Sequence, residues 1–164
     1  MEVRDTLDSQ SASGERSRTR SSLEASSLDL LSSALDAAGV GFARWDAEDR
    51  LVASNDTYVK LVYAGQQSEV RPGRGFAELI RAFYGMPSNV PAGRTAEDMI
   101  AERLRRRACG DASSEYHSNR GWFRVAEARM PDGGAISVYI DVTEERRNEQ
   151  MARERERRLR LLFD

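Results

Sequence analysis

The sequence predicts an α+β fold: a five-stranded antiparallel sheet with helices on one face, one further helix before the sheet and a charged helix after it. Two segments with strand character, 40–54 and 114–142, flank a middle portion whose apolar residues recur at helical spacing. Short hairpin turns connect the strands within each segment, so neighbouring strands run antiparallel. The expected order is therefore two strands, several helices and three strands.

Composition limits the function classes before any motif is considered. The chain has 164 residues, enough for one domain with appendages, and its 25 basic residues, of which only Lys60 is a lysine, nearly balance 27 acidic ones. This balance argues against a dedicated nucleic-acid binder. The sequence has no apolar run of the roughly 18 residues that a membrane span needs, so none is expected. With one His and one Cys, a zinc or iron–sulfur site is not expected either.

The first residues are expected to be disordered, and a helix follows them. Residues 1–26 are rich in Ser and mixed in charge, with too few large apolar side chains to offset the entropy of ordering. The stretch has no apolar core of a secretory signal. Over 27–38, Leu28, Leu31 and Leu35 share one helical stripe, which predicts a helix.

A hairpin and a short helix should open the domain. Residues 40–45 and 51–54 have strand character, and the polar segment 46–50 is their turn. Asn55 follows directly and is a favourable N-cap for a helix that extends to about Tyr63.

Two amphipathic helices are predicted next, each bounded by Gly or by Pro-rich loops. The first covers 76–84, and its apolar stripe consists of Phe76, Leu79, Ile80 and Phe83. The second covers about 95–109 with Thr95 as N-cap, and its apolar stripe consists of Ala96, Met99, Ile100, Leu104 and Ala108.

The second helix ends in the densest basic run of the chain, Arg103, Arg105, Arg106 and Arg107. Such a run could bind phosphate or nucleic acid, but helical spacing spreads its members around the axis. A solvated helix face is therefore the prediction. Cys109 follows this run, and two roles stay open for it: a small half-buried residue, or a redox-active thiol activated by nearby Arg side chains.

Three strands are expected at 114–118, 122–130 and 135–142, with turns at 119–121 and 131–134. In the last strand apolar and polar residues alternate, which predicts one face toward the core. The apolar members of this alternation are Ile136, Val138, Ile140 and Val142.

From Thr143 to Asp164 the chain reads as one charged helix. Glu precedes Arg by four residues at several positions, the favourable order for ion pairs along a helix. The heptad positions are only half apolar, so a two-stranded coiled coil is compatible with the pattern but weakly coded. The last residues, 160–164, fit either an apolar end of that coiled coil or the start of a further module.

Six short motifs, in this order and spacing, resemble those of PAS domains and together cover about 28–146. The Gly-Trp-Phe-Arg-Val and Asp-Gly-Gly motifs most resemble the subgroup in bacterial sensor histidine kinases and cyclic-dinucleotide signalling proteins. The matching motifs are Phe42-Ala-Arg-Trp-Asp46, Arg50-Leu51, Asn55-x-x-Tyr58, Gly121-Trp-Phe-Arg-Val125, Pro131-Asp-Gly-Gly134 and Asp141-Val-Thr-Glu144.

The resemblance implies a domain over 27–142 whose ligand pocket, where one exists, lies between sheet and helices. It also implies that Asp141 and Thr143 couple the sheet to the helix over 143–164. The alternative is that these two residues only cap that helix. The candidate pocket residues are Phe42, Tyr58, Phe76, Ile80, Phe83, Met99, Ile100, Ile136 and Val138.

The expected function is a cytoplasmic sensory and dimerisation module, the N-terminal sensor region of a bacterial histidine kinase, with catalysis outside this chain. Its partner would be a second copy bound through the terminal helices. The alternatives are a ligand-free scaffold that only dimerises, or the sensor part of a cyclic-dinucleotide enzyme. An enzyme built around His117 is a third class. Haem and flavin are not expected, because the helix over 95–109 has no His and the flavin-binding Cys signature is missing.

Overall fold

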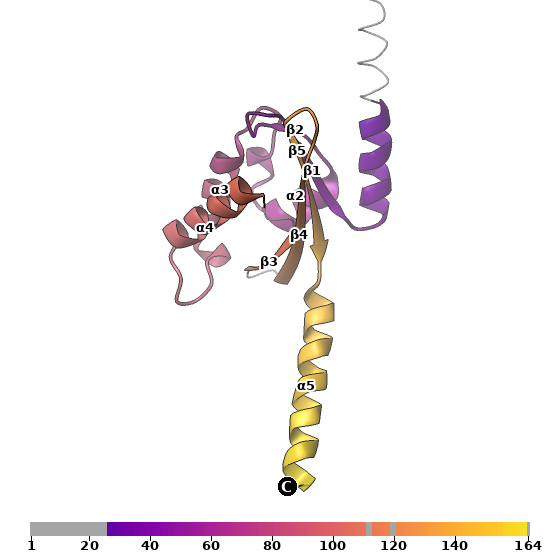
Figure 1. The fold of residues 1–164 in the computed structure, drawn as a ribbon, viewed down its shortest axis with the longest axis vertical. Coiled ribbons are helices and arrows are strands. Elements are labelled where there is room, and N and C mark those ends of the chain that lie inside the picture. The colour runs from indigo at the N-terminus through magenta and orange to yellow at the C-terminus, as the bar shows by residue number, and fades with distance from the viewer. Residues whose placement is uncertain (1–25, 111–112, 119–120, 164) are drawn as a thin grey trace, which may run out of the picture.

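Five antiparallel strands form one sheet in the order β2-β1-β5-β4-β3 (Figure 1). The computed structural model describes residues 26–110, 113–118 and 121–163. The predicted disordered tail falls almost wholly on residues 1–25, which lie outside the described residues; residue 26 already belongs to a helix over 26–37. The predicted α+β fold is confirmed. The strands are β1 (Gly41–Trp45), β2 (Leu51–Ser54), β3 (Ser113–Ser118), β4 (Gly121–Arg129) and β5 (Ala135–Asp141).

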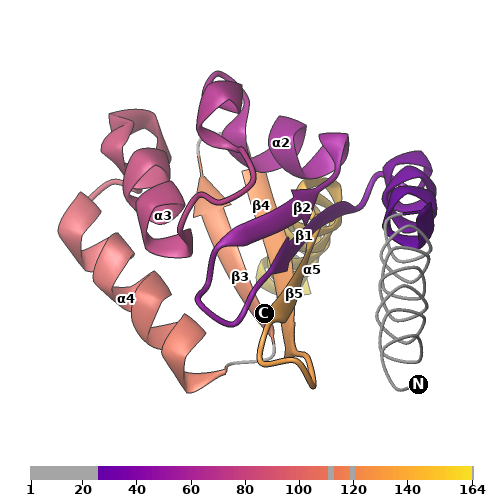
Figure 2. The ribbon, with the colours of Figure 1, turned by 90° about the horizontal axis from the view of Figure 1, so that it is seen from above.

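The helices between β2 and β3 form a layer on one face of the sheet, and the helix over 26–37 lies on the opposite side (Figures 1 and 2). The long helix α5 (Thr143–Phe163) leaves from the end of β5 and extends away from the sheet (Figure 1). The elements of the helical layer are α2 (Asp56–Tyr63), η1 (Gln67–Glu69), α3 (Phe76–Gly85), η2 (Pro87–Asn89) and α4 (Ala96–Cys109).

Asn55 joins the first strands to α2, and its side chain is almost fully buried. The Oδ1 atom accepts hydrogen bonds from the backbone N–H of Phe42 at 2.8 Å and of Tyr58 at 3.0 Å. The Nδ2 group donates to the carbonyl of Val40 at 2.8 Å. The predicted N-cap is confirmed, and the same side chain also satisfies two backbone groups of the chain entering β1.

Gly41 allows α2 to lie very close to the sheet. A Cβ atom at this position would lie 3.1 Å from the Cβ of Tyr139 and 3.1 Å from the Cα of Tyr58. Contacts this short are rare for real side chains, so the absence of a side chain at Gly41 lets the helix and β5 approach each other across β1.

The core lies between the sheet and the helical layer. Trp45 of β1 meets Phe76 of α3 edge-on, with ring centroids 5.1 Å apart. Tyr139 of β5 packs against Tyr58 of α2 at 4.9 Å. Burial of these large aromatic residues supplies most of the apolar area that holds the two layers together.

The alternation in β5 is present, but its orientation is the reverse of the prediction. Ser137 and Tyr139 face the helices, where Tyr139 belongs to the core. Phe42 pairs with Val138 and Arg44 pairs with Ile136 across β1 and β5, and directly opposed residues share a face. Phe42, Ile136 and Val138 therefore lie on the outer face of the sheet, away from the helical layer.

Beyond its first turns, the described side chains of α5 are exposed to solvent. Two of the predicted Glu–Arg pairs form, Glu149 with Arg153 at 3.9 Å and Glu156 with Arg160 at 3.0 Å. Exposed pairs of this kind contribute only about 0.3–0.5 kcal/mol each. Within the described residues, the structure has no helix with the length and apolar character needed to cross a membrane.

Candidate functional site: a tyrosine-lined cavity and its buried ion cluster

A small cavity lies between the helical layer and the strands β3, β4 and β5. It offers about 40 Å³ to the centres of water-sized molecules, and a single water requires about 10–15 Å³ by that measure. The cavity therefore has room for about three waters, or for a molecule of a few non-hydrogen atoms. Its walls are mostly aromatic and aliphatic: Val62, Tyr63, Ile80, Phe83, Tyr84, Arg103, Tyr116, Phe123, Val125 and Tyr139.

Three tyrosines of this cavity, Tyr63, Tyr84 and Tyr139, stay protonated at neutral pH. Burial raises the pKa of Tyr84 to about 12. Burial likewise raises the pKa of Tyr63 and of Tyr139 above the ordinary value for a phenol. Each neutral phenol keeps an O–H that can donate a hydrogen bond.

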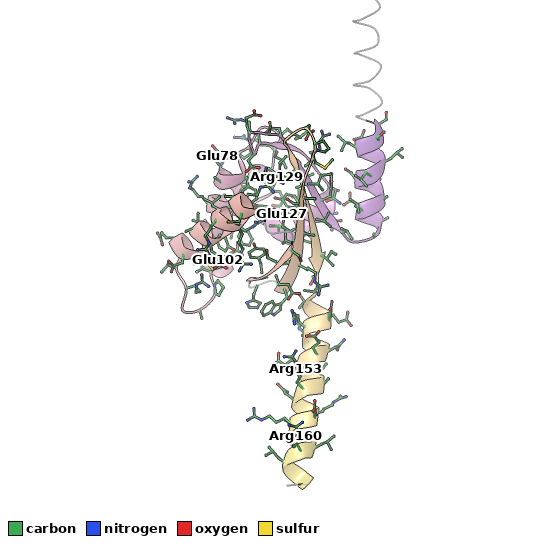
Figure 3. All side chains as sticks on the ribbon, in the orientation of Figure 1. Glu78, Glu102, Glu127, Arg129, Arg153 and Arg160 are labelled. Atoms are coloured by element: carbon green, nitrogen blue, oxygen red, sulfur yellow. The ribbon has the colours of Figure 1, made fainter. Side chains whose placement is uncertain are left out.

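Among the described residues that line the cavity, Arg103 alone has a charged side chain, and it is 4% exposed. Its guanidinium donates to both carboxylate oxygens of Glu127, at 2.8 Å and 3.3 Å. Glu127 projects from β4 toward the helical layer (Figure 3). Such a two-pronged pair fixes the orientation of both side chains as well as their distance.

Arg107, one helical turn further along α4, contacts the same carboxylate and is equally buried. It donates to Glu127 at 2.9 Å and to Asp49, in the turn between β1 and β2, at 2.8 Å. The hydroxyl of Ser137 donates to Glu127 at 2.9 Å and accepts from the indole N–H of Trp45 at 3.0 Å. We call Asp49, Arg103, Arg107, Glu127 and Ser137 the buried ion cluster.

Burial alone would raise the pKa of Glu127, but the hydrogen bond and charge of Arg103, with the charge of Arg107, lower it overall. Aromatic faces complete the surroundings of the two cations. The guanidinium carbons of Arg107 and Arg103 lie 4.5 Å and 4.9 Å from the ring centroid of Phe76. Glu127 is thus paired with two cations that lie against aromatic faces, the partners that buried charges require.

The prediction of a solvated face for the Arg run is wrong for two of its members. Arg105 is exposed and Arg106 pairs with Glu102 at 2.7 Å, whereas Arg103 and Arg107 are buried. A signal was present in the sequence, because both buried residues continue the stripe that begins at Met99. A charged side chain on a helix is ordinarily exposed, so this position on the stripe did not predict burial. No local pattern around Glu127 predicted its pairing with α4.

β4 also contacts α5, so the cluster and the long helix share one strand. Arg124, three residues before Glu127, projects from the outer face and pairs with Glu145 at 3.2 Å. Arg146 pairs with Glu115 of β3, and this contact holds the pKa of Glu115 below its usual value. Two ion pairs therefore join the first turn of α5 to the two strands at one edge of the sheet.

Thr143 and Asp141 make the connection at the start of α5. Asp141 Oδ1 accepts from the N–H of Thr143 at 2.8 Å, and Thr143 Oγ1 accepts from the N–H of Trp122 at 2.9 Å. Gly121, at φ +136°, makes this approach possible, because a Cβ there would overlap the Thr143 hydroxyl. Asp141 caps the start of α5, whereas Thr143 also bonds β4.

The structure separates the predicted pocket residues into three groups. Ile80 and Phe83 line the cavity. Tyr58, Phe76, Met99 and Ile100 belong to or pack against the core beside it. Phe42, Ile136 and Val138 lie on the outer face, so they do not line the space between sheet and helices.

His117 and Cys109 lie outside the cavity. His117 is exposed on β3 and packs against the Trp122 ring, with centroids 4.7 Å apart. Cys109 is exposed at the end of α4 rather than half-buried. Among the described residues, the acidic, His and Cys side chains form no group of three that could hold a metal ion.

Comparison with known proteins identifies the fold. A family model described as the PAS fold matches residues 35–150. A solved structure described as an RNA-binding light-oxygen-voltage receptor aligns with 77% of this chain at 21% identity and a TM-score of 0.45; this chain spans 36% of that protein. The PAS domain of Bordetella pertussis BvgS aligns with 80% of this chain, over 98% of its own length, at 17% identity and a TM-score of 0.44. No curated protein matches the chain.

Proposed function

Because the chain belongs to the PAS-fold family, we propose that it is a cytoplasmic sensory and dimerisation module of a bacterial signalling protein. In this proposal, a change at the cavity alters the sheet, and the sheet changes the orientation or packing of α5. A PAS domain is a signalling module rather than an enzyme, so any catalysis would reside in another domain.

The contacts between β4 and α5 carry this proposal. One strand contains Glu127, which faces the cavity side, and Arg124 and Trp122, which contact the start of α5. A shift of β4 would therefore move the hydrogen bond to Thr143 and the ion pair to Glu145 together. Small shifts become switches when packed elements have two discrete arrangements.

Exposed apolar side chains on both terminal helices support dimerisation. Clustered apolar side chains on an otherwise polar helix are unfavourable in water, and a second copy of the chain would bury them. The α5 helix of the second copy would supply the apolar contacts that the half-apolar heptads of α5 need for a coiled coil. These residues are Leu30, Leu31, Met151, Leu159 and Leu161.

The output domain is proposed to be a histidine kinase, on the resemblance of the motifs over 121–125 and 131–134 to that subgroup. A cyclic-dinucleotide enzyme is the alternative output. A ligand-free scaffold is a second candidate function, favoured by the small size of the cavity.

Amide hydrogen exchange tests the relay. Ile80→Ala enlarges the cavity, and Leu51→Ala is a matched control, because Leu51 is equally apolar and buried but does not line the cavity. We expect both variants to lose global stability, and only Ile80→Ala to lower the protection of the first turn of α5 relative to α4. Equal changes in the two variants would contradict a route from the cavity to α5.

Light scattering at tens of micromolar tests dimerisation. The full chain should be a dimer, and deletion of 147–164 or Leu159→Glu should shift it toward monomer. A full chain that is monomeric, with no effect of the deletion, would exclude the dimer.

A further inference from the structure

The polar groups of the cavity are all hydrogen-bond donors or can act as donors. Arg103 contributes N–H groups, and the remaining polar side chains are the phenols of Tyr63, Tyr84, Tyr116 and Tyr139. Among the described residues, no carboxylate lines the cavity. The Tyr116 hydroxyl already donates to Ser114, and Tyr139 bonds Arg103. A ligand inside the cavity would therefore meet the Arg103 cation and the O–H groups of Tyr63 and Tyr84, a combination that suits an acceptor with negative charge.

The charge balance around Arg103 also favours an anion. Two buried guanidinium groups, those of Arg103 and Arg107, share the single buried carboxylate of Glu127. Asp49, the other acidic partner, pairs with Arg107 and lies one-third exposed at the surface, 34% by side-chain area. Its charge is therefore partly screened by water, so Glu127 is the buried carboxylate that balances both Arg103 and Arg107.

The two bonds to Glu127 and a bond to Tyr139 leave further N–H groups among the five of the Arg103 guanidinium. A second acceptor can therefore bond this residue without breaking the ion pair. The rest of the cavity wall is apolar, with Val62, Ile80, Phe83 and Val125 positioned to contact a hydrocarbon group.

We propose that this cavity binds a small monocarboxylate of about the size of acetate. The carboxylate would bond Arg103 and neighbouring phenols, and the alkyl group would contact the aliphatic and aromatic wall. The volume of about 40 Å³ sets the size, because it accommodates only a few non-hydrogen atoms. This inference rests on the proposed sensory function, since it names the ligand class of that same cavity.

Acetate and acetamide are the probes that test it, because they have nearly the same shape and differ in charge. Thermal unfolding of the full chain is measured over a titration of each probe at constant ionic strength. Sodium acetate should raise the melting temperature in a saturable way, and acetamide should not. Equal effects of the two probes, or a non-saturable effect of acetate, would overturn the proposal.

Arg103→Met and Arg107→Met form a matched pair of variants. Both residues lie on α4, both are 4% exposed and both pair with Glu127, but only Arg103 lines the cavity. Arg103→Met should weaken acetate binding at least tenfold, and Arg107→Met should retain it. Retained binding in Arg103→Met, or equal loss in both folded variants, would overturn the proposed contact. If either variant fails to fold by circular dichroism, the comparison of acetate with acetamide in the unmodified protein decides.

Native mass spectrometry separates this inference from the proposed function. A neutral ligand found in the freshly purified protein, with no response to acetate, would refute the monocarboxylate and leave the sensory function intact. If Ile80→Ala and Leu51→Ala instead change the amide exchange of α5 equally, the sensory function is refuted, whether or not acetate binds.

Discussion

Arg103 and Glu127 form a two-pronged ion pair between α4 and β4, with N–O distances of 2.8 Å and 3.3 Å. The pair joins the middle of α4, in the helical layer, to the last residues of β4 in the sheet. Both side chains are buried, so neither can exchange its partner for water. The consequences of removing this contact can be measured.

Glu127→Gln should destabilise the protein by about 3–5 kcal/mol, because it leaves two buried guanidinium groups without their shared counter-charge. The substitution preserves the shape of the side chain, so lost packing does not contribute. Urea unfolding measures the effect, and Glu48→Gln, at an exposed turn position, serves as the control. A loss below about 1 kcal/mol, the range of surface pairs, would contradict the buried arrangement.

The stabilisation from Glu127 should disappear in acid. Its pKa is lowered in the folded protein, so its contribution is complete above the unfolded value of about 4.3 and is lost as pH falls through the folded value. The gap in unfolding free energy between the unmodified protein and Glu127→Gln should therefore begin to shrink below about pH 5 and keep shrinking as the pH falls through the folded-state pKa of Glu127. Other carboxylates with lowered pKa values are common to both proteins and cancel in this difference. A gap that stays constant over the range would exclude the assigned titration.

Gly121→Ala should loosen the start of α5. The φ of +136° at this position is strained for any residue with a side chain, at about 1–3 kcal/mol, and the new methyl group would overlap the Thr143 hydroxyl. Amide exchange should report faster exchange at Trp122 and in the first turn of α5. Gly85→Ala is the control, because a Cβ at Gly85 meets no atom within 4 Å. Unchanged exchange at Trp122 in Gly121→Ala would show that the contact with Thr143 does not hold this junction.

Asn55→Ala should cost about 2–4 kcal/mol, the sum of a lost helix cap and of a buried backbone N–H at Phe42 left without an acceptor. Thr95→Ala removes the cap of α4, where the side chain accepts from the N–H of Asp98 at an exposed site. That variant should cost only about 1 kcal/mol. Equal costs in chemical unfolding would mean that Asn55 acts as a cap and nothing more.

Local signals predicted the elements well because each depends on nearby residues. Asn55 and Thr95 are the expected N-caps, and Gly110 ends α4 in the left-handed conformation at φ +69°. The hairpin turns predicted that β1 pairs with β2, β3 with β4 and β4 with β5, and the motif over 141–144 predicted the start of α5. These features need no knowledge of distant contacts.

The site was harder to predict because its polar members sit on the buried face. Ser137 faces inward since Trp45 and Glu127 bond its hydroxyl, so the polar residues of β5 point to the core and the apolar ones point outward. Strand alternation defines two faces but does not say which one is covered. Arg103 meets Glu127 across 24 residues of sequence, and no local pattern shows such a pairing.

Gly41 sets how closely α2 can lie on the sheet. A Cβ atom there would lie 3.1 Å from the Cα of Tyr58 and 3.1 Å from the Cβ of Tyr139, so any larger residue would push α2 away from β1. Such a displacement of α2 would carry Tyr63 with it, and Tyr63 lines the cavity. The volume of the cavity therefore depends on a residue that does not line it.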